Sequence, residues 1–160
     1  MKGAKAMYLQ RYTNFLKLII RNQKALQAAI MDARAELLKN KGEYAERDKQ
    51  RPAKPTERLA IKKATQLRKV CILLPDGGWL TVHRPEKWVE VINSVYAAYD
   101  AKRIDELLHE HFDEGKSLDL LAGLYGISRQ TANDYRREFV ADTALLAALH
   151  GLLHRGPQKR

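Results

Sequence analysis

A cluster of polar side chains follows Ser128, in a segment whose apolar spacing predicts a helix from Arg129 to about Phe139. Arg129 and Asn133 stand at positions i and i+4, so they share one helix face, and Gln130 lies about 100° further round the axis. An Arg side chain can form two parallel hydrogen bonds with guanine in the major groove of DNA, and Asn or Gln can do the same with adenine. We therefore predict that Arg129, Gln130 and Asn133 read bases.

Basic groups suited to phosphate binding occur near this segment and also earlier in the chain. Arg136 and Arg137 lie one turn beyond the base-reading positions, and a second basic cluster precedes residue 70. Lys and Arg bind the DNA backbone without regard to sequence. The predicted phosphate contacts are Ser128, Arg136, Arg137, Lys62, Lys63, Arg68 and Lys69. A solvated helix face explains the second cluster equally well.

Two short helices joined by a tight turn would position these groups. The first is predicted over Leu118–Tyr125, and Gly126 can adopt the left-handed conformation that ends a helix. Ser128 is a natural N-cap for the second helix. Together these features predict a helix-turn-helix at residues 117–139.

These residues resemble a known group of DNA-binding modules. The segment 104–153, and Leu121–Tyr135 above all, is similar to the helix-turn-helix of sigma-factor region 4. Phage late-gene transcriptional regulators of the ArpU and RinA kind are similar, with an N-terminal helical segment before that module. The stretch FDEGKSLDLLAGLYGIS also resembles the C-terminal module of the Mor family of phage activators. The resemblance implies double-stranded DNA as partner and the second helix as the element that binds it.

The positive charge of the chain is concentrated away from this motif. The 160 residues carry a net charge of +10. Residues 1–69 hold 18 basic and 6 acidic side chains, a net charge of +12, whereas residues 70–160 hold 11 and 13, a net charge of −2. Because phosphate neutralisation supplies most non-specific affinity for DNA, either the N-terminal half contacts the backbone or the C-terminal half has another partner.

A long N-terminal helix is predicted over Met7–Asn40, within a first segment at residues 1–40. Its apolar stripe resembles a coiled-coil seam, with Asn22 at a heptad a position where a polar residue can fix the register. Pairing between two chains and packing within one chain fit this stripe equally well. If a homodimer forms, the predicted contacts are Tyr8, Tyr12, Phe15, Ile19, Asn22 and Leu26.

The fold class predicted for the whole chain is mainly α, with that long helix, a small β-hairpin and a C-terminal helix-turn-helix bundle. A basic linker and a short helix from Thr56 to about Leu67 occupy residues 41–69. The hairpin occupies residues 70–84, around the turn signal PDGG, and Cys71 is predicted to be a small buried side chain. A helical domain at residues 85–154 ends in a separate helix over Ala141–His154, and residues 155–160 form a polar tail.

Catalytic and metal-binding patterns are not apparent in the sequence. His109 and His111 would point to different helix faces, and His150 and His154 lack a third ligand for zinc. We therefore expect no enzyme activity, metal or cofactor. No apolar run approaches the ~20 residues of a membrane span, and the cytosol of a host cell is the expected location.

Three functions remain open at this stage. The first is a sequence-specific transcriptional regulator of phage or mobile-element origin, binding DNA as a homodimer. The second is an oligomeric DNA-packaging or architectural protein of the small-terminase kind. The third is a protein-interaction module without DNA. An acidic run from Asp105 to Glu114 is either a solvated face or a surface for a basic partner such as RNA polymerase.

Overall fold

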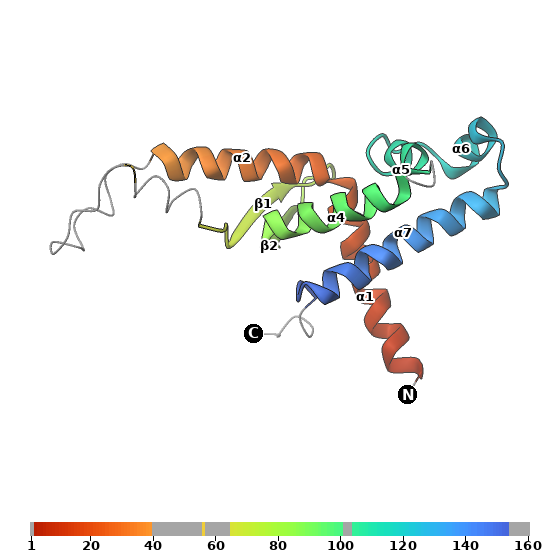
Figure 1. Cartoon of the computed structure of the whole chain (residues 1–160), viewed down its shortest axis with the longest axis horizontal. Coiled ribbons are helices and arrows are strands. Elements are labelled where there is room, and N and C mark those ends of the chain that lie inside the picture. Colours follow the sequence, from red (N-terminus) through yellow and green to blue (C-terminus); the bar gives the residue numbers. More distant parts are fainter. Residues whose placement is uncertain (1, 40–55, 57–64, 101–103, 154–160) are drawn as a thin grey trace. The chain divides into compact units, whose positions relative to one another are not determined.

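The computed structural model describes residues 2–39, 56, 65–100 and 104–153, with side chains from residue 12 onward. The fold is mainly helical with one small two-stranded antiparallel sheet (Figure 1), which confirms the predicted class at this level. The chain divides into two compact units, a helical unit of Met1–Lys24 with Lys87–Arg160 and a hairpin unit of Ala25–Glu86. Within the described ranges, no helix combines the length and the apolar character needed to span a membrane.

The N-terminal region forms two helices, where the sequence predicts one. Helix α1 spans Lys2–Arg21 and helix α2 spans Gln23–Lys39. At Asn22, the side-chain amide donates to the carbonyl of Leu18 at 2.8 Å, and the Asn22 N–H donates to the same oxygen at 3.1 Å. A short amide side chain that bonds the backbone competes with the helical pattern. Asn22 therefore marks an interruption, and the prediction of one unbroken helix is wrong.

The residues predicted to pair two chains are largely packed within one chain. Ile19 and Leu26 are fully buried, and the Phe15 and Trp88 rings form a T-shaped pair with centroids 5.5 Å apart. In the helical unit, α1 lies against α5 and α7. Tyr12 is partly buried, and the side chain of Tyr8 lies outside the described residues. The apolar stripe of α1 thus completes a core inside the chain, which is one of its two predicted uses.

The hairpin unit contains strands β1, Lys69–Leu73, and β2, Trp79–His83, paired as predicted. Val70 pairs with Val82 and Ile72 with Leu80, so these four residues share the inner face. Because side chains alternate along a strand, Cys71 lies on the outer face. It is exposed, and the prediction that it is buried is wrong.

The Glu86 carboxylate forms hydrogen bonds with two other segments of the hairpin unit. Glu86, in the first turn of α4 (Pro85–Asp100), accepts hydrogen bonds from Arg34 Nε at 2.8 Å and from the Leu67 N–H at 3.2 Å. These bonds connect α2 and the chain just before β1 to the start of α4. Of the short basic helix predicted from Thr56 to Leu67, residues 57–64 lie outside the described residues.

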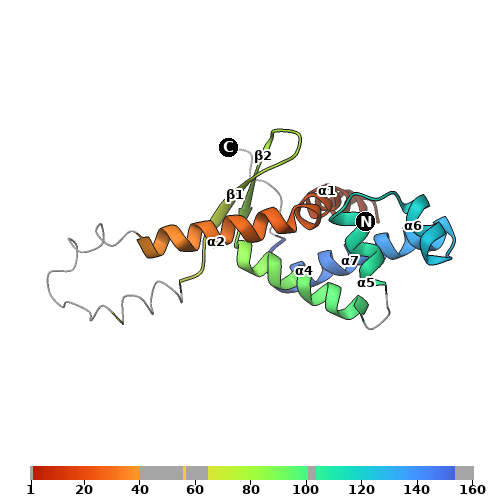
Figure 2. The same cartoon turned by 90° about the horizontal axis from the view of Figure 1, so that it is seen from above.

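The remaining helices of the helical unit are α5, Asp105–Phe112, α6, Leu118–Tyr125, and α7, Arg129–Leu149 (Figure 2). Helix α6 has the predicted bounds. Helix α7 continues past Phe139, so the prediction of a separate last helix over Ala141–His154 is wrong. The sequence between Phe139 and Leu149 contains no Gly or Pro that would end the helix. The Thr143 hydroxyl donates a hydrogen bond to the Phe139 carbonyl at 2.8 Å, within the same helix.

The core of the helical unit is centred on Phe139. Its ring contacts Tyr96 and Tyr99 of α4 and Phe112 of α5, with centroids 4.6, 5.3 and 5.6 Å away. Phe139 is fully buried, and the Tyr99 hydroxyl donates to Asp142 at 2.9 Å. Aromatic groups at these separations add to the stabilisation from burial. This packing fixes the middle of α7 against α4 and α5.

Helices α6 and α7 each begin at a serine N-cap, and a glycine ends α6. The Ser117 hydroxyl accepts the Leu120 N–H at 3.3 Å, and the Ser128 hydroxyl accepts the Thr131 N–H at 3.0 Å. Gly126 is left-handed, with φ 65°, and the Ile127 N–H bonds the Ala122 carbonyl at 3.0 Å. Helix α6 therefore ends at Tyr125, and α7 begins four residues later at Arg129.

Alanine at the two glycines of this region should change stability in opposite directions. Gly126→Ala should lower the free energy of unfolding by about 1–2 kcal/mol, because a Cβ is unfavourable in the left-handed region. Gly123→Ala, inside α6, should raise it by about 0.5–1 kcal/mol, because alanine loses less backbone entropy. A Cβ at either position meets nothing within 4 Å, so packing does not confound the pair. Urea unfolding followed by circular dichroism measures both, and a stabilising Gly126→Ala would contradict this geometry.

Candidate nucleic-acid interface

A cavity of about 690 Å³ opens between α5, the start of α6 and the first half of α7, and we call it the α6–α7 pocket. All its lining residues belong to the helical unit. They are His111, Ser117, Leu118, Asp119, Arg129, Gln130, Asn133 and Arg136. The three predicted base-reading residues and one predicted phosphate contact therefore line one concave surface.

Two of the predicted base-reading side chains are held by exposed polar contacts. Arg129 Nε lies 2.9 Å from the Asp119 carboxylate, and the two side chains are 77% and 62% exposed. Gln130 donates to Asp134 at 3.0 Å. Exposed pairs of this kind contribute little to stability, so a ligand can replace them at small cost. Asn133 is partly buried in the same wall.

The predicted phosphate contacts are not all brought together. Arg136 lines the pocket, and Arg137 is exposed on α7 but outside the pocket wall. The Ser128 hydroxyl is engaged in capping α7 and bonds the Thr131 hydroxyl at 2.8 Å. Arg68 and Lys69 are exposed in the hairpin unit, while Lys62 and Lys63 lie outside the described residues.

Two basic residues that the sequence analysis missed accompany Arg136. Lys17 and Arg21 lie one turn apart on α1, which packs against α7. Partial burial lowers the pKa of Lys17, and the positive charges of Arg136 and Arg21 lower it further. The three cations are therefore close enough to repel one another. The i and i+4 spacing of Lys17 and Arg21 was a usable signal, but only the packing of α1 associates them with α7.

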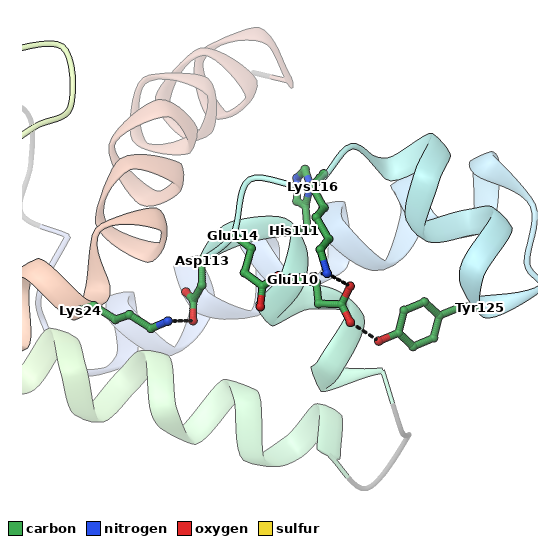
Figure 3. Close-up of polar contacts among 7 residues, drawn as sticks. All are labelled: Lys24, Glu110, His111, Asp113, Glu114, Lys116 and Tyr125. Atoms are coloured by element: carbon green, nitrogen blue, oxygen red, sulfur yellow. Dashed lines mark hydrogen bonds and ion pairs between the residues drawn. The ribbon is translucent and has the colours of Figure 1, made fainter.

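A polar network holds the loop between α5 and α6 (Figure 3). The Glu110 carboxylate accepts hydrogen bonds from Lys116 at 2.8 Å and from the Tyr125 hydroxyl at 3.0 Å. These two bonds lower the pKa of Glu110. Lys116 also lies 3.0 Å from Glu114. The network connects α5, the loop and the end of α6.

His111 of α5 is bonded to the same loop. The residue is 8% exposed, and its Nδ1 lies 2.9 Å from the Lys116 carbonyl. Because a carbonyl only accepts, Nδ1 carries the proton in this bond. Burial lowers the pKa of His111, the bond to Lys116 opposes that shift, and the charges of Arg21, Arg136 and Lys17 add to it. The other ring nitrogen, Nε2, is buried without a hydrogen-bond partner among the described residues.

The other features singled out in the sequence have local partners. His109 stacks on Tyr96 with centroids 3.8 Å apart and lies 3.2 Å from Asp113, which also pairs with Lys24 at 3.7 Å. Part of the acidic run from Asp105 to Glu114 is therefore ion-paired within the chain. No group of three or more His, Cys, Asp or Glu residues that could hold a metal occurs among the residues that the structure describes.

No protein-family profile, curated protein or solved structure matches this chain.

If this surface binds DNA as the sequence predicts, removing the acidic group from the pocket wall should strengthen that binding. Asp119→Asn abolishes a negative charge that would face phosphates and releases Arg129, so the dissociation constant for a mixed-sequence duplex should fall about two- to fivefold, the range for exposed charges. Glu106→Gln is the matched control, because Glu106 is exposed on α5 outside the pocket wall. Fluorescence anisotropy at one fixed salt concentration measures both. Weaker binding by Asp119→Asn would contradict this assignment.

Proposed function

We propose that this protein is a sequence-specific DNA-binding regulator of transcription, of phage or mobile-element origin. The observation that carries the proposal is the α6–α7 pocket wall, where Arg129, Gln130 and Asn133 lie beside Arg136. Side chains of these types recognise guanine and adenine edges, and basic groups beside them bind phosphate. The resemblance of Leu121–Tyr135 to the region-4 module supports the same function.

In this proposal, α6, the turn and α7 act as a helix-turn-helix. The N-terminal part of α7 enters the major groove, as recognition helices do. The capped turn at Gly126 fixes α7 relative to α6, and Phe139 anchors its middle in the core. The reading surface is therefore carried by a rigid helix, which favours precise hydrogen bonding with bases.

The uneven charge of the sequence is consistent with this proposal. The C-terminal half lacks excess positive charge, but Lys17 and Arg21 of α1 accompany Arg136. We infer that α1 contributes phosphate contacts next to the recognition helix. Homodimerisation stays a prediction, and Ile19 and Leu26 are not available for it because they are buried within the chain. Contact of the acidic run with RNA polymerase and a location in the host cytosol also stay predictions.

A protein-interaction role is a second candidate. Leu120 and Leu124 lie one turn apart on α6 and are 52% and 64% exposed. Exposed leucines that are neighbours on a helix suit a protein partner. If the chain binds no DNA of any sequence, the protein-interaction role is favoured over the DNA-binding role. The packaging alternative stays open, and assembly into a ring of many copies would favour it over a regulator.

Base reading predicts a selective loss of affinity. Gln130→Ala or Asn133→Ala should cost about 1–3 kcal/mol at a duplex selected from a random pool and little at scrambled DNA. The ratio of specific to non-specific affinity should therefore fall about tenfold or more. Gln27→Ala, an exposed glutamine on α2, is the control. Equal losses on both duplexes would mean that α7 does not read bases.

The phosphate role of α1 predicts a change in salt dependence. Arg21→Gln should weaken binding to all sequences alike and reduce the slope of log affinity against log salt by about 0.9, the value for one lost phosphate contact. Lys87→Gln makes the same change of charge at an ion pair with Glu90 on α4 and should leave the slope unchanged. Anisotropy titrations over a series of salt concentrations provide the slopes. Identical slopes for the two variants would show that Arg21 of α1 does not contact a phosphate.

A further inference from the structure

The α6–α7 pocket combines an anion-attracting helix end with an unsatisfied histidine. Ser117, Leu118 and Asp119 in its wall form the start of α6, and the N–H groups of Leu118 and Asp119 have no carbonyl partner within the helix. The N-terminus of a helix carries partial positive charge and commonly binds phosphate. Independently, His111 belongs to the same wall, and its buried Nε2 has no partner among the described residues.

The hydrogen-bonding capacity of His111 Nε2 indicates the chemical class of the ligand. Because Nδ1 donates to the Lys116 carbonyl, Nε2 of the neutral ring can only accept a hydrogen bond. If the ring gains a proton, both nitrogens become donors and the bond to Lys116 is kept. The charged ring could then donate Nε2–H to an anionic oxygen. A phosphate oxygen in the pocket would satisfy this nitrogen and offset the repulsion from the nearby cations.

We propose that the α6–α7 pocket binds one backbone phosphate of DNA and that His111 takes up a proton as it does so. This inference rests on the proposed function, because it assigns the nucleic-acid backbone as the ligand. The phosphate accepts from the free N–H groups at the start of α6, from Arg136 and from His111 Nε2–H. Binding is then coupled to pH, because the neutral ring presents a lone pair to the anion.

The surrounding charges determine the direction of this coupling. Lys17 and Arg21 on α1 and Arg136 on α7 oppose protonation of His111 in the free protein. The ammonium of Lys116 is paired with Glu110 and Glu114, and Asp119 is paired with Arg129. Arrival of a phosphate neutralises part of the excess positive charge and raises the pKa of the ring. Affinity should therefore increase as pH falls, over the range in which the free ring is neutral and the bound ring is charged.

The test measures the pH dependence of duplex binding by the full chain. From about pH 8 down to about pH 5.5, affinity for a mixed-sequence duplex should rise, with a slope that approaches one proton and so at most about tenfold per pH unit. A phosphodiester does not titrate in this range, so the group that takes up the proton from solvent belongs to the protein. His111→Gln keeps a side-chain donor without a charge and should lose most of this slope. His83→Gln, an exposed histidine on β2, should keep it. Equal slopes for the wild type and His111→Gln would overturn the proposal.

A second measurement uses the wild-type chain and does not depend on the folding of a variant. NMR titration of the His111 ring, with and without the duplex, should show its pKa raised by DNA. If DNA binds and the pKa does not move, the phosphate assignment is overturned while the proposed function stands. If no DNA binds, inorganic phosphate replaces it as the probe. A pKa raised by phosphate alone would then support the pocket while the proposed function fails, and an unmoved pKa would overturn both.

Discussion

The helical unit depends on the packing of Phe139 against Tyr96, Tyr99 and Phe112. This aromatic cluster joins α4, α5 and α7 at one point of the core. It lies in the middle of α7, so the first half of that helix projects from a fixed support. The polar residues from Arg129 to Arg136 occupy this supported half, and their geometry therefore depends on the core behind them.

The second constraint is the packing of α1 against α7. It places Lys17 and Arg21 close enough to Arg136 for the three charges to affect one another. Three neighbouring cations destabilise the free protein, because like charges repel. An anion at this surface would relieve the repulsion, so the cost in the free protein favours a negatively charged partner. Proteins often accept such local costs where they bind a ligand.

The sequence was sufficient for features that depend on local chemistry. The caps Ser117 and Ser128 and the left-handed Gly126 give α6 its predicted bounds and fix the start of α7. The PDGG turn likewise determines the hairpin, although strand register reversed the expected burial of Cys71. Long-range packing was not predictable. Nothing local associates Lys17 with Arg136. The Lys116 carbonyl that holds His111 is only five residues away, but the ring reaches it through the conformation of the loop between α5 and α6. The heptad pattern predicts a coiled-coil register role for Asn22, whereas the structure places it between the end of α1 and the start of α2.

The proposed DNA-binding surface lies where α1, the start of α6 and the first half of α7 come together. The most direct measurement is a map of amide chemical-shift changes when a mixed-sequence duplex is added to the full chain. We expect changes at the start of α6 around Leu118, along Arg129 to Arg136, and at Lys17 and Arg21. Changes confined to the hairpin at Lys69–His83, or none at saturating DNA, would contradict it.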